Sequence, residues 1–345
     1  MSPGEIRRCL TRLSAAASVE LAHKKPHWGD AILCDGLIYA ARALGDDAPL
    51  EAAARWFEPK LKGGPRSEGW FWFWAAEALP ALDLYRRIGK IAYLDHARAV
   101  VSAFESKATR TPDGAVVPHP PALEVWVDVS YFTAPAMALL GRLDDDEHLI
   151  EQALDQMIVH HRNLSDGASG LTWHVAYVEK KSHSACLWAR GNSWFSIAAA
   201  QVLMESVAAG VQARFAGKAA TIREALARQL DAIVRLQDGS GLWHTVIDRA
   251  DSYLEASATA GFALALGRAI RMNLAGLDSA RAGDAYDRAL AAISSKINGD
   301  GQFTGVSQQT PPGDFAFYQS VELGTAPFGT GVCMMALAEA LGAGE

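Results

Sequence analysis

Apolar residues recur along the chain at the spacing of helical faces, and two kinds of predicted helix alternate. The first kind is rich in Ala, Gly and Leu and apolar almost all round, which is typical of helices buried on both sides. It occupies residues 31–45, 76–89, 133–143, 195–210, 259–273 and 329–342. The second kind has one apolar stripe and one charged face, as outer helices do, and occupies residues 48–59, 91–106, 146–164, 219–238 and 282–297. Residues 1–23 are predicted to form a first helix.

The alternation repeats at a loose period of about 40 to 70 residues, which indicates an internal repeat of helical hairpins. An open solenoid has the same local pattern, but its repeats keep tighter lengths and end in polar caps. The last segment, 329–342, instead has the composition of a buried helix. We therefore expect an all-α fold in which six hairpins close into an (α/α)6 barrel, with residues 1–345 as a single domain.

The connections between the predicted hairpins are long, aromatic and rich in Gly and Pro. They cover residues 63–74, 111–128, 165–194, 237–248 and 298–331. In a closed ring these connections gather at one end. Function concentrates in such loops on a rigid scaffold, so we expect the binding site there.

Composition narrows the classes of partner. Half of the 345 residues are hydrophobic and the formal net charge is −7. Nucleic acids and anionic membranes require a basic patch, which the sequence lacks, so neither is an expected partner. The four cysteines are scattered without paired spacing, which favours a reduced compartment and a cytoplasmic location. Arg7, Arg8, Arg12 and Glu20 interrupt any signal-peptide core, and no apolar run approaches the roughly 20 residues of a membrane helix.

Nine of the ten tryptophans lie at the entries of the apolar helices or in the loops before them. They are Trp28, Trp70, Trp72, Trp74, Trp126, Trp173, Trp188, Trp194 and Trp243. Large aromatic faces with a polar edge suit the C–H faces and hydroxyl rims of sugars. Some of these residues are expected to be core anchors. Trp28, Trp70, Trp126 and Trp188 are predicted to contact a bound sugar.

The segment "ARGNSW" at residues 189–194 places polar side chains at the start of an apolar helix. Arg190 and Trp194 are four residues apart and share one face if the helix starts by Asn192. The planar guanidinium grips a carboxylate in bidentate fashion, which indicates a uronic acid. We expect Arg190, Asn192 and Trp194 to bind sugar; an arginine that caps a neighbouring helix is the alternative.

Asp128 stands where another apolar helix begins, in "ALEVWVDVSYFTAP" behind Trp126. Burial among apolar neighbours raises the pKa of a carboxyl group toward the range useful for a general acid. Asp128 is therefore the predicted catalytic residue, with an ordinary helix N-cap as the alternative interpretation. Glu124, four residues earlier, is either a second carboxylate or a solvated loop charge.

Three histidines, His119, His174 and His244, fall in the same loops, and His174 is the strongest candidate among them. Each alone is more often a hydrogen-bonded structural residue than a catalytic one. His119 and His174 are predicted to line the sugar pocket. The sequence has no HExxH, CxxC, P-loop, GxGxxG or GxSxG motif in a suitable context, so we expect neither a metal nor a cofactor.

These motifs resemble a known family. "WARGNSW" (188–194) is similar to the W-x-R-G-N-G-W signature of the unsaturated uronyl hydrolases of glycoside hydrolase families 88 and 105. "VWVDVSYFTAP" (125–135) resembles their W-x-D-x-L-Y-M-A-x-P segment. The stretches at 171–177, 241–248, 252–266 and 324–331 also match in order. The resemblance covers about residues 25–340.

The resemblance implies an (α/α)6 barrel that removes a Δ4,5-unsaturated glucuronyl or galacturonyl residue from oligosaccharides left by a polysaccharide lyase. It implies that Asp128 is the general acid and base, and that His174, Arg190 and Trp194 hold the sugar. The implied reaction is hydration of the enol ether, for which one carboxyl group suffices. A glycosidase of the ordinary kind needs two, about 5 to 9.5 Å apart.

Two positions depart from the family pattern. Phe73 or Trp74 stands where the family usually has a second aspartate, and Glu68 and Glu77 are the nearest carboxylates. Ser193 replaces the second glycine of the signature.

Three other functions stay open. One is a saturated β-glucuronidase that uses Asp128 with Glu124 or Glu77. Another is a sugar epimerase or isomerase, which requires His119, His174 and His244 to converge. The third is a carbohydrate-binding or helical-repeat interaction protein, in which Asp128 has no catalytic role.

Overall fold

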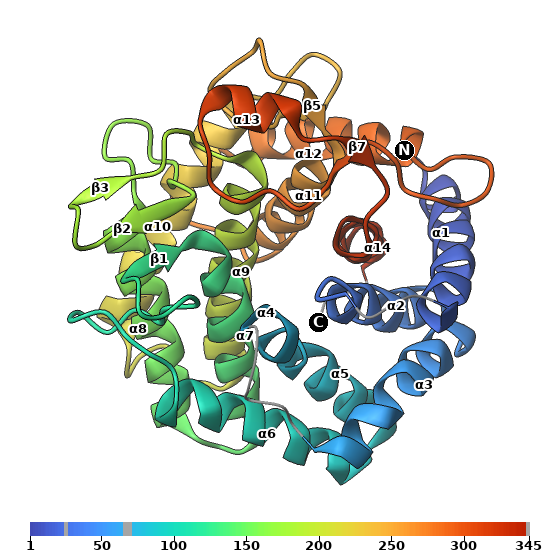
Figure 1. The fold of residues 1–345 in the computed structure, drawn as a ribbon. Helices are drawn as coiled ribbons and strands as arrows, with labels where there is room; N and C mark the ends of the chain where they lie inside the picture. The colour runs from blue at the N-terminus through green and yellow to red at the C-terminus, as the bar shows by residue number, and fades with distance from the viewer. Residues whose placement is uncertain (24–26, 65–70, 343–345) are drawn as a thin grey trace.

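The predicted helices form two concentric rings in the computed structural model, which describes residues 1–23, 27–64 and 71–342 (Figure 1). The inner ring consists of α2 (Asp30–Leu44), α5 (Ala78–Ile88), α7 (Val127–Leu143), α9 (Ala189–Ala208), α11 (Ala256–Arg271) and α14 (Pro327–Ala340). The outer ring consists of α1 (Pro3–His23), α3 (Ala48–Gly63), α6 (Ile91–Ser106), α8 (Glu147–Leu164), α10 (Ala216–Arg235) and α12 (Ser279–Ser295). The predicted (α/α)6 barrel is confirmed.

The pattern of apolar residues explains which helices are inside. In α7, every residue from 127 to 141 is buried, because the helix contacts the outer ring on one side and the barrel interior on the other. An outer helix such as α8 buries a single face. The carboxylate of Asp146 caps α8 by accepting a hydrogen bond from the N–H of Leu149 at 3.2 Å.

The ring closes where α14 packs against α2 (Figure 1). The two backbones approach closely at a pair of glycines. A Cβ atom on Gly36 would lie 2.6 Å from the carbonyl oxygen of Gly331, so neither position has room for a side chain. This contact joins the first and last inner helices.

Short strands and two short helices decorate one end of the barrel, and the sequence pattern did not predict them. β1 (Glu124–Trp126), β2 (Val175–Tyr177) and β3 (Ser182–His183) form an antiparallel sheet, β4 (Trp243–His244) pairs with β5 (Leu254–Glu255), and β6 (Val306–Ser307) pairs with β7 (Leu323–Gly324). The short helices are α4 (Phe71–Ala75) and α13 (Phe315–Ser320). Strands of two or three residues are too short for alternation to appear.

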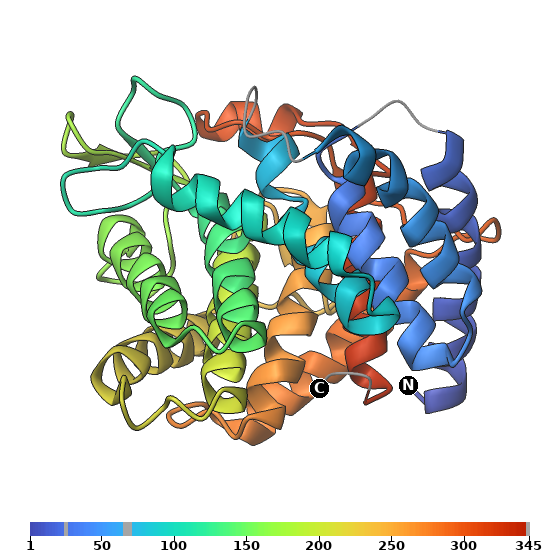
Figure 2. The same ribbon diagram turned by 90° about the horizontal axis from the view of Figure 1, so that it is seen from below.

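These elements lie at the end of the barrel where the inner helices begin (Figure 2). Trp126 pairs with Val175 in the register of β1 and β2, and the chain enters α7 directly afterwards. β5 leads into α11 in the same way. The strands therefore fix the backbone at the N-termini of the inner helices.

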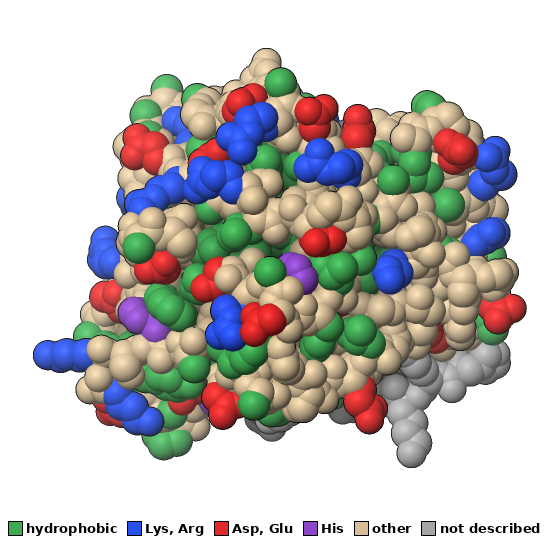
Figure 3. All heavy atoms as spheres, turned by 90° about the horizontal axis from the view of Figure 1, so that it is seen from above, with side chains coloured by type: hydrophobic (Ala, Val, Ile, Leu, Met, Phe, Trp, Pro, Cys, Tyr) green, Lys and Arg blue, Asp and Glu red, His purple; other side chains and the backbone are tan. Residues whose placement is uncertain are grey.

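The surface shows mixed charge. On the face drawn in Figure 3, basic and acidic side chains are interspersed. Among the described residues, no helix is both long and apolar enough to cross a membrane.

Candidate active site

A cavity of about 330 Å³ opens at the end of the barrel that carries the strands. It is lined by Trp28, Trp72, His119, Trp126, Asp128, Phe132, His174, Trp188, Arg190, Gln309, Thr310 and Pro311. Seven residues predicted to form the site are thus brought together: Trp28, His119, Trp126, Asp128, His174, Trp188 and Arg190. They come from the starts of α2, α7 and α9 and from the loops before them.

Asp128 lies in the first turn of α7 and is 9% exposed. The strand before it is anchored, because the N–H of Val127 donates to the carbonyl of His174 at 3.0 Å. Burial raises the pKa of Asp128 to about 6, while the charge of Arg190 and a backbone hydrogen bond act in the opposite direction. Asp128 is the only carboxylate among the described residues that line the cavity.

Aromatic rings form the walls. Trp28 stacks on Phe328 with ring centroids 5.0 Å apart and an angle of 3°. On the other side, Trp126 meets His174 edge to face at 5.5 Å, and Trp72 lies 5.9 Å from Trp126. Flat apolar walls around one buried acid suit the C–H faces of a sugar ring.

His174 lies beside Asp128 and is 1% exposed. Its Nδ1 is 2.7 Å from the hydroxyl of Tyr318, and its Nε2 is 3.7 Å from Oδ2 of Asp128. Burial, with a smaller contribution from the charge of Arg190, lowers the pKa of His174 to about 3. The ring is therefore neutral at physiological pH.

Arg190 is 2% exposed, and protein groups already occupy its terminal nitrogens. One nitrogen donates to the carbonyl and hydroxyl oxygens of Ser307 at 2.9 and 2.6 Å. The other donates to the Gln308 carbonyl and the Thr310 hydroxyl, both at 3.0 Å. The guanidinium carbon lies 4.6 Å from the ring of Trp188. The two terminal nitrogens are therefore not free for the predicted bidentate grip on a substrate carboxylate. They hold the 307–310 segment, while Nε of Arg190 has no hydrogen-bond partner among the described residues.

Two predicted sugar-binding residues, Trp194 and Asn192, do not line the cavity. α9 begins at Ala189, so Arg190 stands in its first turn and Trp194 lies more than a turn inside the barrel. It is buried against Tyr131, with ring centroids 4.8 Å apart. Asn192 is 0% exposed and bonds to Thr172. Both predictions are corrected: these side chains pack the barrel wall.

The other candidate carboxylates and histidines lie elsewhere. Glu77 is ion-paired with Lys60 at 2.6 Å and hydrogen-bonded to His96 at 3.0 Å. Glu124 accepts a hydrogen bond from the indole of Trp126 at 2.9 Å but does not line the cavity.

His119 lines the cavity, where its Nε2 accepts from the indole N–H of Trp72 at 3.3 Å. His244 hydrogen-bonds to the carbonyl of Ser252 outside the cavity, so the three histidines do not converge. Trp70 and Glu68 fall outside the described residues.

Four lining residues were not anticipated: Phe132, Gln309, Thr310 and Pro311. Phe132 follows Asp128 by four residues on one helix, so helical spacing could have identified it. The segment 309–311 reaches the site from a distant loop, and no local pattern marks it. No group of three or more His, Cys, Asp or Glu in the described parts of the chain is placed to hold a metal ion.

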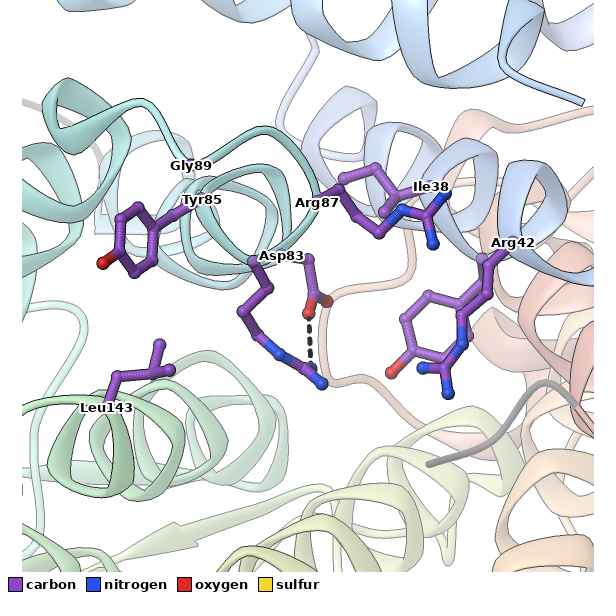
Figure 4. Close-up of a pocket in the computed structure, with 9 residues that line it drawn as sticks. Ile38, Arg42, Asp83, Tyr85, Arg87, Gly89 and Leu143 are labelled. Atoms are coloured by element: carbon purple, nitrogen blue, oxygen red, sulfur yellow. Dashed lines mark hydrogen bonds and ion pairs between the residues drawn. The ribbon is translucent and has the colours of Figure 1, made fainter. Parts of the chain in front are cut away.

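A larger cavity of about 660 Å³ lies where the inner helices end (Figure 4). Its charged lining includes Arg42 and Arg87 as well as Arg86, which donates to Asp83 at 3.1 Å. These arginines stand in the last turns of α2 and α5, where basic residues offset the helix dipole. The carboxylate that lines this cavity, Asp83, is already paired with Arg86, and no tryptophan is among the described lining residues. The Asp128 cavity, with its unpaired acid and tryptophan walls, is therefore the candidate active site.

Comparison with known proteins shows the family of the chain. The family model for glycosyl hydrolase family 88 matches residues 6–343. The chain belongs to this family. It is 31% identical over 237 residues to the unsaturated rhamnogalacturonyl hydrolase YesR of Bacillus subtilis, a match that covers 66% of this chain and 64% of YesR.

Solved structures of other glycoside hydrolases share the fold. A family 105 glycoside hydrolase of C. acetobutylicum superposes with a TM-score of 0.84 at 19% identity, over 96% of this chain and 98% of that one. The unsaturated glucuronyl hydrolase of Bacillus sp. GL1 superposes with a TM-score of 0.75 at 15% identity, over 97% of this chain and 96% of that one. The resemblance noted in the sequence is confirmed at the level of family and fold.

Proposed function

We propose that this family 88 protein removes a terminal Δ4,5-unsaturated uronic acid from oligosaccharides produced by a polysaccharide lyase, with Asp128 as general acid and base. The observation that carries the proposal is the isolation of one desolvated carboxyl group, Asp128, among the described residues of an aromatic cavity. The names of YesR and of the Bacillus sp. GL1 enzyme support an unsaturated uronide as substrate.

The proposed reaction needs one carboxyl group used twice. Asp128 donates its proton to C4, the electrons of the C4=C5 double bond form the new C–H bond, and positive charge develops at C5 and the ring oxygen. A water molecule then adds to C5 and returns a proton to the Asp128 carboxylate. The resulting hemiketal opens and releases the partner sugar.

The arrangement of carboxylates favours this hydration over direct hydrolysis. Direct hydrolysis uses an acid and a second carboxylate about 5 to 9.5 Å away, on opposite sides of the bond. Glu124 is hydrogen-bonded to Trp126, and Glu77 is ion-paired with Lys60 and hydrogen-bonded to His96. Neither lines the cavity beside Asp128.

The cavity walls suit a sugar ring that is flattened by a double bond. Trp28 and Trp188 offer apolar faces, and Thr310 and Gln309 supply polar groups at the rim. Arg190 places positive charge behind Trp188 without exposing its terminal nitrogens. We expect Arg190 to favour an anionic sugar through its field and by holding the rim, since it makes no direct bidentate contact.

The test follows the ultraviolet absorbance of the conjugated enol ether while the protein acts on lyase-generated pectin and glycosaminoglycan disaccharides. The wild-type protein is expected to abolish the absorbance of at least one disaccharide, and Asp128→Asn is expected to reduce the rate by at least about 1000-fold. Glu124→Gln, an isosteric change at the neighbouring carboxylate, is the matched control and should stay within a few fold of wild type. Absorbance that persists on every substrate, or equal rates in Asp128→Asn and Glu124→Gln, contradicts the proposal.

A further inference from the structure

Tyr318 reaches the candidate active site from behind. It lies on α13, which Asp314 caps by accepting a hydrogen bond from the N–H of Phe317 at 2.9 Å. Tyr318 is 0% exposed, packs against Cys186 and Trp188, and does not line the cavity. Its hydroxyl is 2.7 Å from Nδ1 of His174, which is about 140 residues earlier in the chain.

The environment of the phenol determines which way this hydrogen bond runs. Burial raises the pKa of Tyr318, so the phenol keeps its proton. Nδ1 of His174 is the hydrogen-bond partner of the phenol hydroxyl among the described residues. A buried phenol hydrogen needs an acceptor, so we expect it to be donated to Nδ1 of His174. The neutral imidazole then carries its single proton on Nε2.

The opposite edge of the imidazole faces the catalytic carboxyl. Nε2 is 3.7 Å from Oδ2 of Asp128, and that oxygen is buried without a hydrogen-bond partner among the described residues. A proton on Nε2 directs a positive edge at this oxygen, whereas the other tautomer directs a lone pair at it. The tautomer of His174 therefore decides whether its imidazole stabilises or destabilises the ionised form of Asp128.

We propose that Tyr318 is a positioning residue, which holds His174 in the Nε2–H tautomer so that its N–H faces the carboxyl group of Asp128. The catalytic consequence rests on the proposed function, because the carboxylate that His174 stabilises is the product of the first proton transfer. Tyr318, on α13 at the rim of the barrel, thereby influences the protonation of Asp128 in the first turn of α7.

The other titratable groups around this trio are few. Arg190 faces both Asp128 and His174 from α9, and Glu255, at the start of α11, lies 3.8 Å from Arg190. His119 stands across the cavity against Trp126, with ring centroids 5.0 Å apart. Cys186 packs against Tyr318, and the charges of Asp128 and Tyr177 also act on its phenol. None of these residues makes a hydrogen bond to Nδ1 or Nε2 of His174 in the described structure.

The first experiment needs no substrate. In ¹⁵N-labelled wild-type protein, the ring nitrogens of His174 are assigned by their loss in His174→Gln, and their chemical shifts distinguish a protonated from an unprotonated nitrogen. An unprotonated Nδ1 and a protonated Nε2 between pH 6 and 8 are expected. A protonated Nδ1 overturns the proposal, whatever reaction the protein catalyses.

The second experiment uses Tyr318→Phe, which removes the hydroxyl and keeps the ring. Losing the Nε2–H donor destabilises the Asp128 carboxylate, so the alkaline limb of the kcat/KM profile is expected to move up by roughly 0.5 to 1 pH unit. We expect kcat to fall about 3- to 10-fold, while KM stays within about twofold because Tyr318 does not line the cavity.

Tyr93→Phe is the matched control, since Tyr93 is also buried but bonds to Glu58 at 3.3 Å, far from the cavity. Its pH profile should coincide with that of the wild type. If the pH profile of Tyr318→Phe coincides with those of the wild type and Tyr93→Phe, then Tyr318 does not influence the protonation of Asp128 and the proposal is refuted. If no disaccharide is turned over, the proposed function fails and the tautomer is still decided by the ring shifts.

Discussion

Replacing Asn192 by alanine is expected to destabilise the fold without changing substrate binding. The side chain is 0% exposed and makes five hydrogen bonds. Its oxygen accepts from the N–H and hydroxyl of Thr172 at 2.8 and 3.1 Å, and from the amide of Gln229 at 3.0 Å. Its nitrogen donates to the carbonyls of Thr172 and Trp188, both at 2.9 Å. Asn192 thus ties the loop before β2 to α9.

The magnitude depends on which partners find a replacement. The carbonyl of Trp188 keeps its helical bond from the N–H of residue 192 at 3.0 Å. Gln229 can still donate to the hydroxyl of Thr172, at 3.4 Å. The N–H and carbonyl of Thr172 lose their Asn192 partner inside the barrel wall, and each such buried group costs about 1 to 3 kcal/mol. With a small cavity added, we expect the free energy of unfolding to fall by about 3 to 5 kcal/mol.

Equilibrium unfolding in guanidinium chloride, followed by tryptophan fluorescence, measures this loss. Asn163→Ala is the control: Asn163 is partly exposed and bonds to Asp113 at 2.8 Å, so its replacement should cost less than about 1 kcal/mol. A KM raised tenfold or more in Asn192→Ala, with stability within 1 kcal/mol of wild type, would show that Asn192 contacts the sugar and would refute the reasoning.

Four further predictions concern the charge of Asp128, the packing at Gly331 and the cavity rim held by Arg190. Burial raises the pKa of Asp128 from 3.8 to about 6, so ionisation of this side chain lowers the free energy of unfolding as the pH rises through that window. The Asp128→Asn variant should therefore have a free energy of unfolding up to about 3 kcal/mol above that of the wild type at pH 8, and nearly the same value at pH 4. For the same reason, the wild-type kcat/KM should decline above about pH 6, where the acid form is lost. Gly331→Ala places a methyl group against the backbone of Ile32 and should lower the unfolding free energy by about 1 to 3 kcal/mol, whereas Gly217→Ala in α10, with open space around it, should be neutral or slightly stabilising; thermal unfolding compares the two. Arg190→Lys should weaken binding of a uronide and of its neutral counterpart by similar factors in calorimetry, because it releases the rim; a loss confined to the uronide would restore direct recognition of the carboxylate.

The sequence predicts the rings of helices well because burial on one or two sides leaves a different apolar pattern. It also predicts much of the cavity lining, since Trp126 and Asp128 stand at the entry to α7 and His174 lies in a loop at the same end of the barrel. The sequence does not predict to which side of its helix a polar side chain points. The polarity of Asn192 does not tell whether its amide faces the cavity or the barrel wall, and the start of α9 at Ala189 decides this.

The sequence also does not identify site residues that come from distant segments of the chain. Thr310 and Tyr318 reach Arg190 and His174 across more than 100 positions of the chain, and their own neighbourhoods resemble ordinary loop sequence. Nothing within a helical or strand period links them to the site. Three-dimensional packing alone brings them there.

The glycine contact between α2 and α14 also has a consequence for how the chain is made. Gly36 and Gly331 are about 300 positions apart, so at about 5 to 20 residues per second a ribosome needs roughly 15 to 60 s to deliver the second after the first. Throughout that interval the inner face of α2 lacks its final neighbour, and the barrel wall is an open arc with an uncovered apolar edge. The barrel is therefore completed in a late step of biosynthesis, and a nascent chain that stalls before α14 is the species most in need of a chaperone.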